Sequence, residues 1–276
     1  MTTTLILIRH GETSWNAVKR IQGFTDIALN DVGLRQADDL GERFARLAKG
    51  QAEGQTEGQT EEAHTDARPD GQTNDQAHAR THDPLAEHLA QADGASGFGD
   101  RPISAVYTSD LVRAQQTAAP LAKALGLTPV VDASVRERNY GSFEGMSPEE
   151  IAERYPDEYA HWQTRDPEFR PGPGESQQMF HNRVVAALRA IVAKHPGERI
   201  VVVAHGGVLD NARRHAQSLP LQRKRDYLLL NASINVFAFD DGAVRMISWG
   251  DVAHLHADDA AQDDTRPERV PDTRIV

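Results

Sequence analysis

The stretch Thr-Leu-Ile-Leu-Ile-Arg-His-Gly, residues 4–11, shares its pattern with the stretch Ile-Val-Val-Val-Ala-His-Gly-Gly, residues 200–207. Each is a continuous aliphatic run that ends near a histidine followed by glycine. Such runs are typical of strands that are buried on both faces of a parallel sheet. In open α/β sheets, ligands bind at the carboxyl ends of these strands. The repeated pattern therefore predicts an α/β fold with His10 and His205 on the same rim of its sheet.

The rest of the chain alternates strand and helix patterns. Strands are expected at Thr4–Ile8, Ile103–Tyr107, Ile200–Ala204, Ile234–Phe239 and Val244–Trp249. Helices are expected over residues 31–48, 110–125, 147–155, 175–194 and 206–218. Strands that are separated by helices, followed by two strands joined as a hairpin, predict a three-layer α/β/α fold with a mostly parallel central sheet.

One long segment does not fit this alternation. Residues 51–84 contain no Val, Ile, Leu, Met, Phe, Trp or Tyr, and such a segment cannot bury enough apolar area to offset the entropy that it loses on ordering. We expect one domain over residues 1–256, interrupted by a disordered or loosely held insert at about 50–100, and a polar tail over 257–276. Four histidines fall in the insert: His64, His78, His82 and His88. Their irregular spacing favours polar filler over a metal-binding tract.

The composition excludes several classes of function. The chain of 276 residues carries 30 Lys and Arg against 41 Asp and Glu, a net charge of -11, which disfavours nucleic-acid and anionic-membrane partners. It contains no cysteine, so disulfides, thiolate catalysis and Cys-ligated metals are excluded. No apolar run approaches the ~20 residues of a membrane span, and the N-terminus lacks the features of a signal peptide. We therefore expect a cytoplasmic protein.

Cations and glycine recur at the predicted rim. Arg9 precedes the first of the two histidines, and Arg113 falls in the first turn of a predicted helix. A cation in that turn opposes the helix dipole, so helix stability explains Arg113 poorly. A planar guanidinium suits bidentate contact with phosphate, and the alternative is a surface salt bridge with Asp110 or Asp132. Gly206 begins the last predicted helix, where backbone N–H groups can face an anion.

Short motifs follow one another along the chain in a specific order. They are Arg9-His10-Gly11, Trp15-Asn16, Gln22-Gly23, Arg113-Ala114, Glu137, Gly174-Glu175-Ser176 and His205-Gly206-Gly207. Together they resemble the histidine phosphatase superfamily, the phosphoglycerate mutase-like clan. The resemblance covers nearly the whole chain apart from the insert and the tail. The Arg-His-Gly triplet alone is short, and the order of all the motifs makes the match specific.

The resemblance implies a role for each of these residues. His10 would attack phosphorus and form a phosphohistidine. His205, Arg9 and Arg113 would stabilise the transferring phosphoryl group. Glu137 would act as general acid toward the leaving alkoxide and then as base toward water. Further contacts to phosphate or substrate would come from Asn16, Gln22 and Gly23.

Elementary chemistry agrees with these roles. A neutral imidazole is a competent nucleophile near pH 7, and phosphoryl transfer needs in-line positioning and neutralised equatorial oxygens. Glu137 must carry a proton to serve the leaving group, so its surroundings are expected to raise its pKa. The alternative for Glu137 is an ion pair with Arg136 or Arg138. Glu175 is expected to cap or brace the next helix, and the alternative is a supporting contact to His205 or Arg9.

Two features favour a phosphatase over a mutase. In the family, mutases typically carry Asn after the second His-Gly, where this chain has Gly207. Residues 146–175 contain eight Asp or Glu, three Arg and no Lys, a balance that disfavours a doubly anionic ligand. We expect a phosphomonoester phosphatase that needs no metal and no cofactor and that acts on a small phosphorylated metabolite.

The sequence leaves alternatives open. One is a cofactor-dependent phosphoglycerate mutase, and another is a non-catalytic, phosphate-binding regulatory module, since a fold does not fix a function. The 12 histidines leave room for a metallohydrolase, but histidines accompanied by arginines suit phosphate better than zinc. A homodimer that pairs the final strands of two copies is also open.

Overall fold

The computed structural model describes residues 1–57, 83–94 and 101–256. Within these residues, six strands form one sheet in the order β3-β2-β4-β1-β5-β6. The strands are β1 (Thr3–Arg9), β2 (Ile103–Thr108), β3 (Val130–Val131), β4 (Arg199–Ala204), β5 (Ile234–Asp240) and β6 (Ala243–Asp251). β1 to β4 pair in parallel, while β5 and β6 join them antiparallel. This mixed sheet confirms the predicted α/β fold and each of the five predicted strands.

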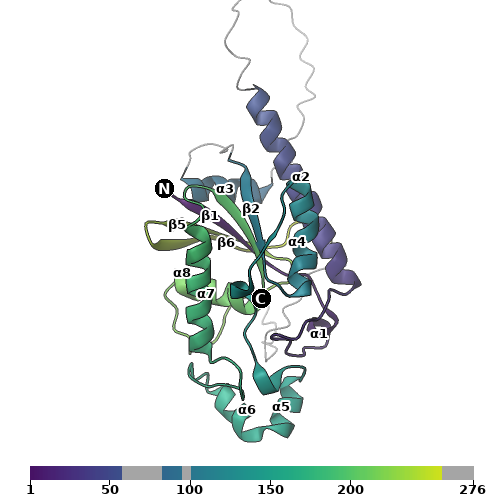
Figure 1. The fold of residues 1–276 in the computed structure, drawn as a ribbon, viewed down its shortest axis with the longest axis vertical. Helices are drawn as coiled ribbons and strands as arrows, with labels where there is room; N and C mark the ends of the chain where they lie inside the picture. The colour runs from purple at the N-terminus through teal and green to yellow at the C-terminus, as the bar shows by residue number, and fades with distance from the viewer. Residues whose placement is uncertain (58–82, 95–100, 257–276) are drawn as a thin grey trace, which may run out of the picture.

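Helices cover both faces of the sheet (Figure 1). On one face lie α2 (Asp31–Glu57), α3 (Pro84–Asp93) and α4 (Val112–Ala124), and on the other lie α7 (Gln177–Val192) and α8 (Gly206–Ala216). Successive side chains of a strand point to opposite faces. In β1, Ile6 and Ile8 therefore pack on the first set of helices, and Leu5 and Leu7 pack on the second. The three layers are those that the sequence predicts.

A smaller lobe projects beyond one end of the sheet. It contains α5 (Pro148–Arg154) and α6 (Pro156–Gln163), at the bottom of Figure 1. Phe143, Ile151 and Phe169 form its own buried cluster. The predicted helix at 147–155 corresponds to α5, whereas α6 was not predicted because it buries no residue of its own. The short α1 (Ser14–Ala17) and β3 were also missed, as were the 3-10 turns Ala133–Val135 and Gly141–Phe143.

Both ends of the segment predicted to be disordered, residues 50–100, contain helix in the structure. α2 continues to Glu57, and α3 is an ordered helix whose Leu85, Leu89 and Ala92 are buried in the core. These apolar residues recur at helical spacing, so they form one buried stripe. Asp83 caps the helix by accepting a hydrogen bond from the backbone N–H of Leu85. The average polarity of residues 50–100 therefore conceals a helix that belongs to the core.

Three ion pairs connect α3 and the residue before it with the rest of the fold, directly or through Arg43. Arg43, only 2% exposed, pairs with Asp83 at 2.6 Å and with Asp251 at 2.7 Å. Asp93 and Arg199 are both 2% exposed and lie 2.6 Å apart. Removing one partner of a buried pair leaves an uncompensated charge, which is strongly destabilising. α3 is thus tied to both β4 and β6.

Three of the four histidines of the predicted insert, and the predicted tail, cannot be compared with the structure. His88 lies in α3, whereas His64, His78 and His82 and the tail over 257–276 lie outside the described residues. Across the described ranges, no group of three or more potential metal ligands occurs. In the same part of the chain, no helix has both the length and the apolar character that a membrane crossing requires.

Candidate active site

The two motif histidines meet at the carboxyl ends of β1 and β4. These strands are parallel neighbours, with Arg9 in register with Ala204, and the backbone N–H of His10 donates to the carbonyl oxygen of Ala204 at 3.0 Å. The ring centroids of His10 and His205 lie 5.3 Å apart. The prediction that both imidazoles share one rim is therefore confirmed.

The surroundings of His10 keep its imidazole neutral. Its Nδ1 lies 2.7 Å from the carbonyl oxygen of Gly11, so the ring proton is held there and Nε2 keeps its lone pair. Burial lowers the pKa of His10 well below its ordinary value, and the charges of Arg113 and Arg9 lower it further. Burial also lowers the pKa of His205, with Arg113 as the next cause. Both rings are thus neutral near pH 7.

Arg113 is buried and faces the site. Its side chain is fully covered, and its guanidinium donates to the carbonyl oxygens of Thr25 at 2.9 Å and Gly23 at 2.8 Å. Burial lowers its pKa to about 10, so it stays charged near pH 7. The alternative of a surface salt bridge is excluded, since Asp110 pairs with Arg136 instead.

Gly23 forms the turn that presents its carbonyl oxygen to Arg113. Its φ is +53, a left-handed value that favours glycine. A Cβ at this position would lie 2.2 Å from Oε1 of Glu144, and that carboxylate accepts a hydrogen bond from the backbone N–H of Phe24 at 2.9 Å. Gly23 therefore acts through Arg113 as well as by lining the site.

Glu137 is held by backbone donors. Its Oε1 accepts from the backbone N–H of Arg138 at 2.7 Å, and its Oε2 accepts from that of Gly207 at 2.9 Å. Burial raises the pKa of Glu137, although these two hydrogen bonds and the charges of Arg113 and Arg9 oppose the rise. The predicted direction is confirmed, and no ion pair joins Glu137 to Arg136 or Arg138.

One cavity of about 530 Å³ brings most of the predicted site together. Its lining includes Arg9, His10, Asn16, Gln22, Gly23, Arg113 and Glu137. His205 and Gly206 are buried and are not part of this lining, whereas Gly207 is. His205 therefore adjoins the lining residue His10 without lining the cavity itself, and of the two glycines only Gly207 is part of the lining.

The cavity is strongly cationic although the whole chain has a net charge of -11. Among the described residues that line it, four are acidic: Glu137, Glu149, Asp166 and Asp210. Nine are basic: Arg9, Lys19, Arg20, Arg113, Arg138, Arg165, Arg214, Lys224 and Arg225. A cleft lined by one sign of charge concentrates ligands of the opposite sign. This arrangement suits an anionic ligand.

The acidic composition of residues 146–175 does not describe the wall that this segment contributes to the cavity. From that segment, only two of its acidic residues, Glu149 and Asp166, reach the cavity. Sequence reasoning also missed the basic residues that other parts of the chain contribute to the lining, among them Lys224 and Arg225, since no short motif marks them. The expectation that this segment disfavours a doubly anionic ligand is therefore wrong.

Glu175 makes contacts different from those of a helix cap. Ser176 is the N-cap of α7, and the Glu175 carboxylate pairs with Arg183 of that helix at 2.7 Å. The prediction that it braces the next helix is confirmed. The alternative contact with His205 or Arg9 is not formed.

The opposite pKa shifts of His10 and Glu137 set the expected pH profile. His10 must be neutral to attack, so the acid limb of kcat/KM should lie well below 6.5, the ordinary histidine value. Glu137 must be protonated to act as an acid, so activity should fall as pH rises through a pKa above 4.5. Glu137→Gln should lose this alkaline limb, and the exposed Glu158→Gln should keep it. Rate profiles on an alkyl phosphate measure both, and an unchanged limb in Glu137→Gln would contradict the assignment.

A family model described as histidine phosphatase superfamily (branch 1) matches residues 5–53 and 58–252. The chain belongs to the histidine phosphatase superfamily. It is 34% identical over 254 residues to phosphoglycerate mutase-like protein 4 of Arabidopsis thaliana, covering 91% of this chain and 86% of that protein. It is also 34% identical over 255 residues to a metal-independent phosphoserine phosphatase of the same plant, covering 92% and 83%.

Solved structures share the fold. Bacillus stearothermophilus YhfR superposes with a TM-score of 0.65 at 26% sequence identity, covering 92% of this chain and all of that one. A phosphoserine phosphatase from Entamoeba histolytica superposes with a TM-score of 0.65 at 21% identity, covering 92% of this chain and all of that one. At that identity, the second likeness concerns the fold alone.

Proposed function

We propose that this chain is a phosphomonoester phosphatase that works without metal or cofactor through a phosphohistidine at His10. The observation that carries the proposal is the neutral His10–His205 pair beside Arg9 and Arg113, with the buried Glu137 facing the same cavity. The metal-independent phosphoserine phosphatase relative supports it.

The first half-reaction forms the phosphoenzyme. Nε2 of His10 attacks phosphorus, the ester P–O bond breaks, and Glu137 gives its proton to the departing alkoxide. Arg9 and Arg113 neutralise the equatorial oxygens. The neutral ring of His205 adds an N–H donor beside the reacting nitrogen.

The second half-reaction regenerates the enzyme. Glu137, now a carboxylate, takes a proton from water while that water attacks the phosphohistidine. The P–N bond breaks, His10 recovers its lone pair, and inorganic phosphate leaves with one oxygen from water. The same carboxyl group therefore serves as acid and then as base, as microscopic reversibility requires.

A group of arginines in the lining of the cavity supports a substrate with a second anionic group. Burial lowers the pKa of Arg165, and the charges of Arg214 and Arg225 lower it further, while the charge of Asp210 opposes them. Asp210 pairs with Arg214 at 2.8 Å, so three arginines face one carboxylate there. A carboxylate or a second phosphate on the substrate would balance the positive charge that remains. The phosphoserine phosphatase relative is named for a substrate of this kind, since phosphoserine carries a carboxylate. We propose a small phosphorylated carboxylic acid as the substrate.

A matched pair of substrates tests both parts of this proposal. 3-phosphoglycerate and glycerol 3-phosphate differ by one carboxylate, and inorganic phosphate should be released from both, with higher kcat/KM for the acid. Activity should persist in EDTA and be inhibited by vanadate, which mimics five-coordinate phosphorus. Formation of 2-phosphoglycerate faster than phosphate release would show a mutase, and loss of all activity in EDTA would show a metallohydrolase. Binding of phosphate without turnover of any ester would favour the regulatory module.

The remaining predictions stay proposals. We also propose that the protein works in the cytoplasm. The net charge of -11 supports the absence of nucleic-acid and anionic-membrane partners. A single domain over 1–256 and a homodimer through the final strands likewise stay open to direct measurement.

A further inference from the structure

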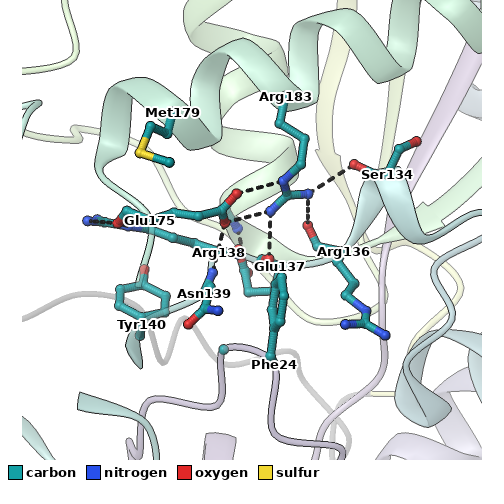
Figure 2. Close-up of polar contacts among 12 residues, drawn as sticks. Phe24, Ser134, Arg136, Glu137, Arg138, Asn139, Tyr140, Glu175, Met179 and Arg183 are labelled. Atoms are coloured by element: carbon teal, nitrogen blue, oxygen red, sulfur yellow. Dashed lines mark hydrogen bonds and ion pairs between the residues drawn. The ribbon is translucent and has the colours of Figure 1, made fainter. Parts of the chain in front are cut away.

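The guanidinium of Arg183 uses all five of its N–H groups on one short segment and one carboxylate (Figure 2). Nε and Nη2 donate to the two carboxylate oxygens of Glu175, at 2.8 and 2.7 Å. Nη1 donates to the carbonyl oxygens of Ser134 and Arg136, each at 2.9 Å. Nη2 also donates to the carbonyl oxygen of Glu137 at 2.9 Å. An arginine has five such donors, so each is satisfied by a fixed partner.

Glu175 holds the same segment from its other end. Its Oε2 accepts from the backbone N–H of Asn139 at 2.9 Å, and its own N–H donates to the Asn139 carbonyl oxygen at 2.8 Å. The guanidinium of Arg138 donates to the Glu175 carbonyl oxygen at 3.0 and 2.8 Å. The Arg183–Glu175 ion pair and the side chain of Arg138 therefore hold the main chain on both sides of Glu137.

The Arg183–Glu175 ion pair is anchored on helix α7. Arg183 lies in the middle of α7, next to the fully buried Val184, and its guanidinium is 5.0 Å from the ring of Phe180. Hydrogen bonds from Arg183 and from the backbone of Asn139 hold the pKa of Glu175 below its ordinary value, against the effect of burial. Glu175 thus stays ionised across the neutral range, and neither residue lines the cavity.

We propose that Arg183 and Glu175 are positioning residues for the proton donor. They fix the backbone of the segment Ser134–Asn139, and through it the place of the Glu137 carboxyl group beside Gly207. This inference rests on the proposed phosphatase mechanism. Displacing a reacting group by about 1 Å can cost about 10²-fold in rate. Because neither residue lines the cavity, the pair affects proton transfer only through the position of Glu137.

Two substrates with different leaving groups distinguish a role in positioning Glu137 from a role in the stability of the fold. An alkoxide needs a proton to depart, whereas p-nitrophenolate leaves without one. Arg183→Gln should lower kcat/KM for 3-phosphoglycerate by about 10²-fold and for p-nitrophenyl phosphate by only a few-fold. Its alkaline pH limb should also weaken. The matched control is Arg189→Gln, on the same helix, where the side chain contacts His215 instead of the Glu137 segment.

A second variant keeps the test decisive if Arg183→Gln fails to fold. Glu175→Gln preserves the size of the side chain and removes one charge, so it should show the same selectivity for the alkyl phosphate with a smaller loss. Equal losses on both substrates in a folded variant, or no loss on either, would overturn the positioning role. If wild-type protein hydrolyses neither ester, the proposed function fails first, and that outcome is distinct.

Discussion

His10→Ala is expected to abolish the hydrolysis of phosphomonoesters, with kcat reduced by about 10⁴-fold or more. The reason is chemical rather than structural, since no other imidazole among the described residues lies in the cavity to accept the phosphoryl group. His10 follows β1, which ends at Arg9, so the sheet pairing does not depend on its side chain. The variant should therefore fold and still bind vanadate through Arg9 and Arg113.

Trapping the intermediate gives a second measurement. Wild-type protein quenched during turnover of a radiolabelled substrate should carry label in a bond that is labile in acid and stable in alkali, as a phosphoramidate is. His10→Ala should carry none. His215→Ala is the matched control, because that ring contacts Arg189 of α7 and is not part of the cavity lining. Label that persists in His10→Ala would mean that another group is the nucleophile.

Gly207→Ala is expected to lower kcat/KM for alkyl phosphates by about 10²- to 10⁴-fold, the usual contribution of general acid catalysis. A Cβ at residue 207 would lie 2.2 Å from Oε1 of Glu137 and 2.8 Å from a ring carbon of Phe180. The carboxyl group would have to leave the N–H on which it depends. In a helix, alanine is by itself better than glycine by about 1 kcal/mol, so loss of α8 would not explain the defect.

A double-mutant cycle is the control for this prediction. Glu137→Gln alone should cost a similar factor, and adding Gly207→Ala to it should cost little more, because the displaced acid is already absent. Residues that act as one unit give such non-additive effects. Full additivity of the two losses would show that Gly207 acts through something other than Glu137.

The rim of the sheet was predictable because its signals are local. The two apolar runs before His10 and His205 identify buried strands, and parallel strands place their ends together. α3 was not predictable from averaged composition, because only Leu85, Leu89 and Ala92 carry its apolar stripe. Its attachment through Asp93 depends on Arg199, and that pair joins residues far apart in the chain.

The environment of the catalytic acid was only partly predictable. The order of the motifs identified Glu137. The need to protonate the leaving group then predicted that its pKa is raised. The grip of Arg183 on this segment is directed at backbone carbonyl oxygens, which every residue type carries, so no sequence signal marks it. The charge of the cavity was misjudged for a related reason, since composition does not say which way a side chain points.

The surplus of positive charge in the cavity has a consequence for the end of each catalytic cycle. Arginines that capture a dianionic ester attract orthophosphate equally, and escape of this product requires the ion to leave the same field. Mobile ions screen such a field within about 10 Å at 0.1 M. Salt should thus slow the arrival of the ester while it hastens the exit of phosphate, and the fastest cycling would fall at an intermediate ionic strength.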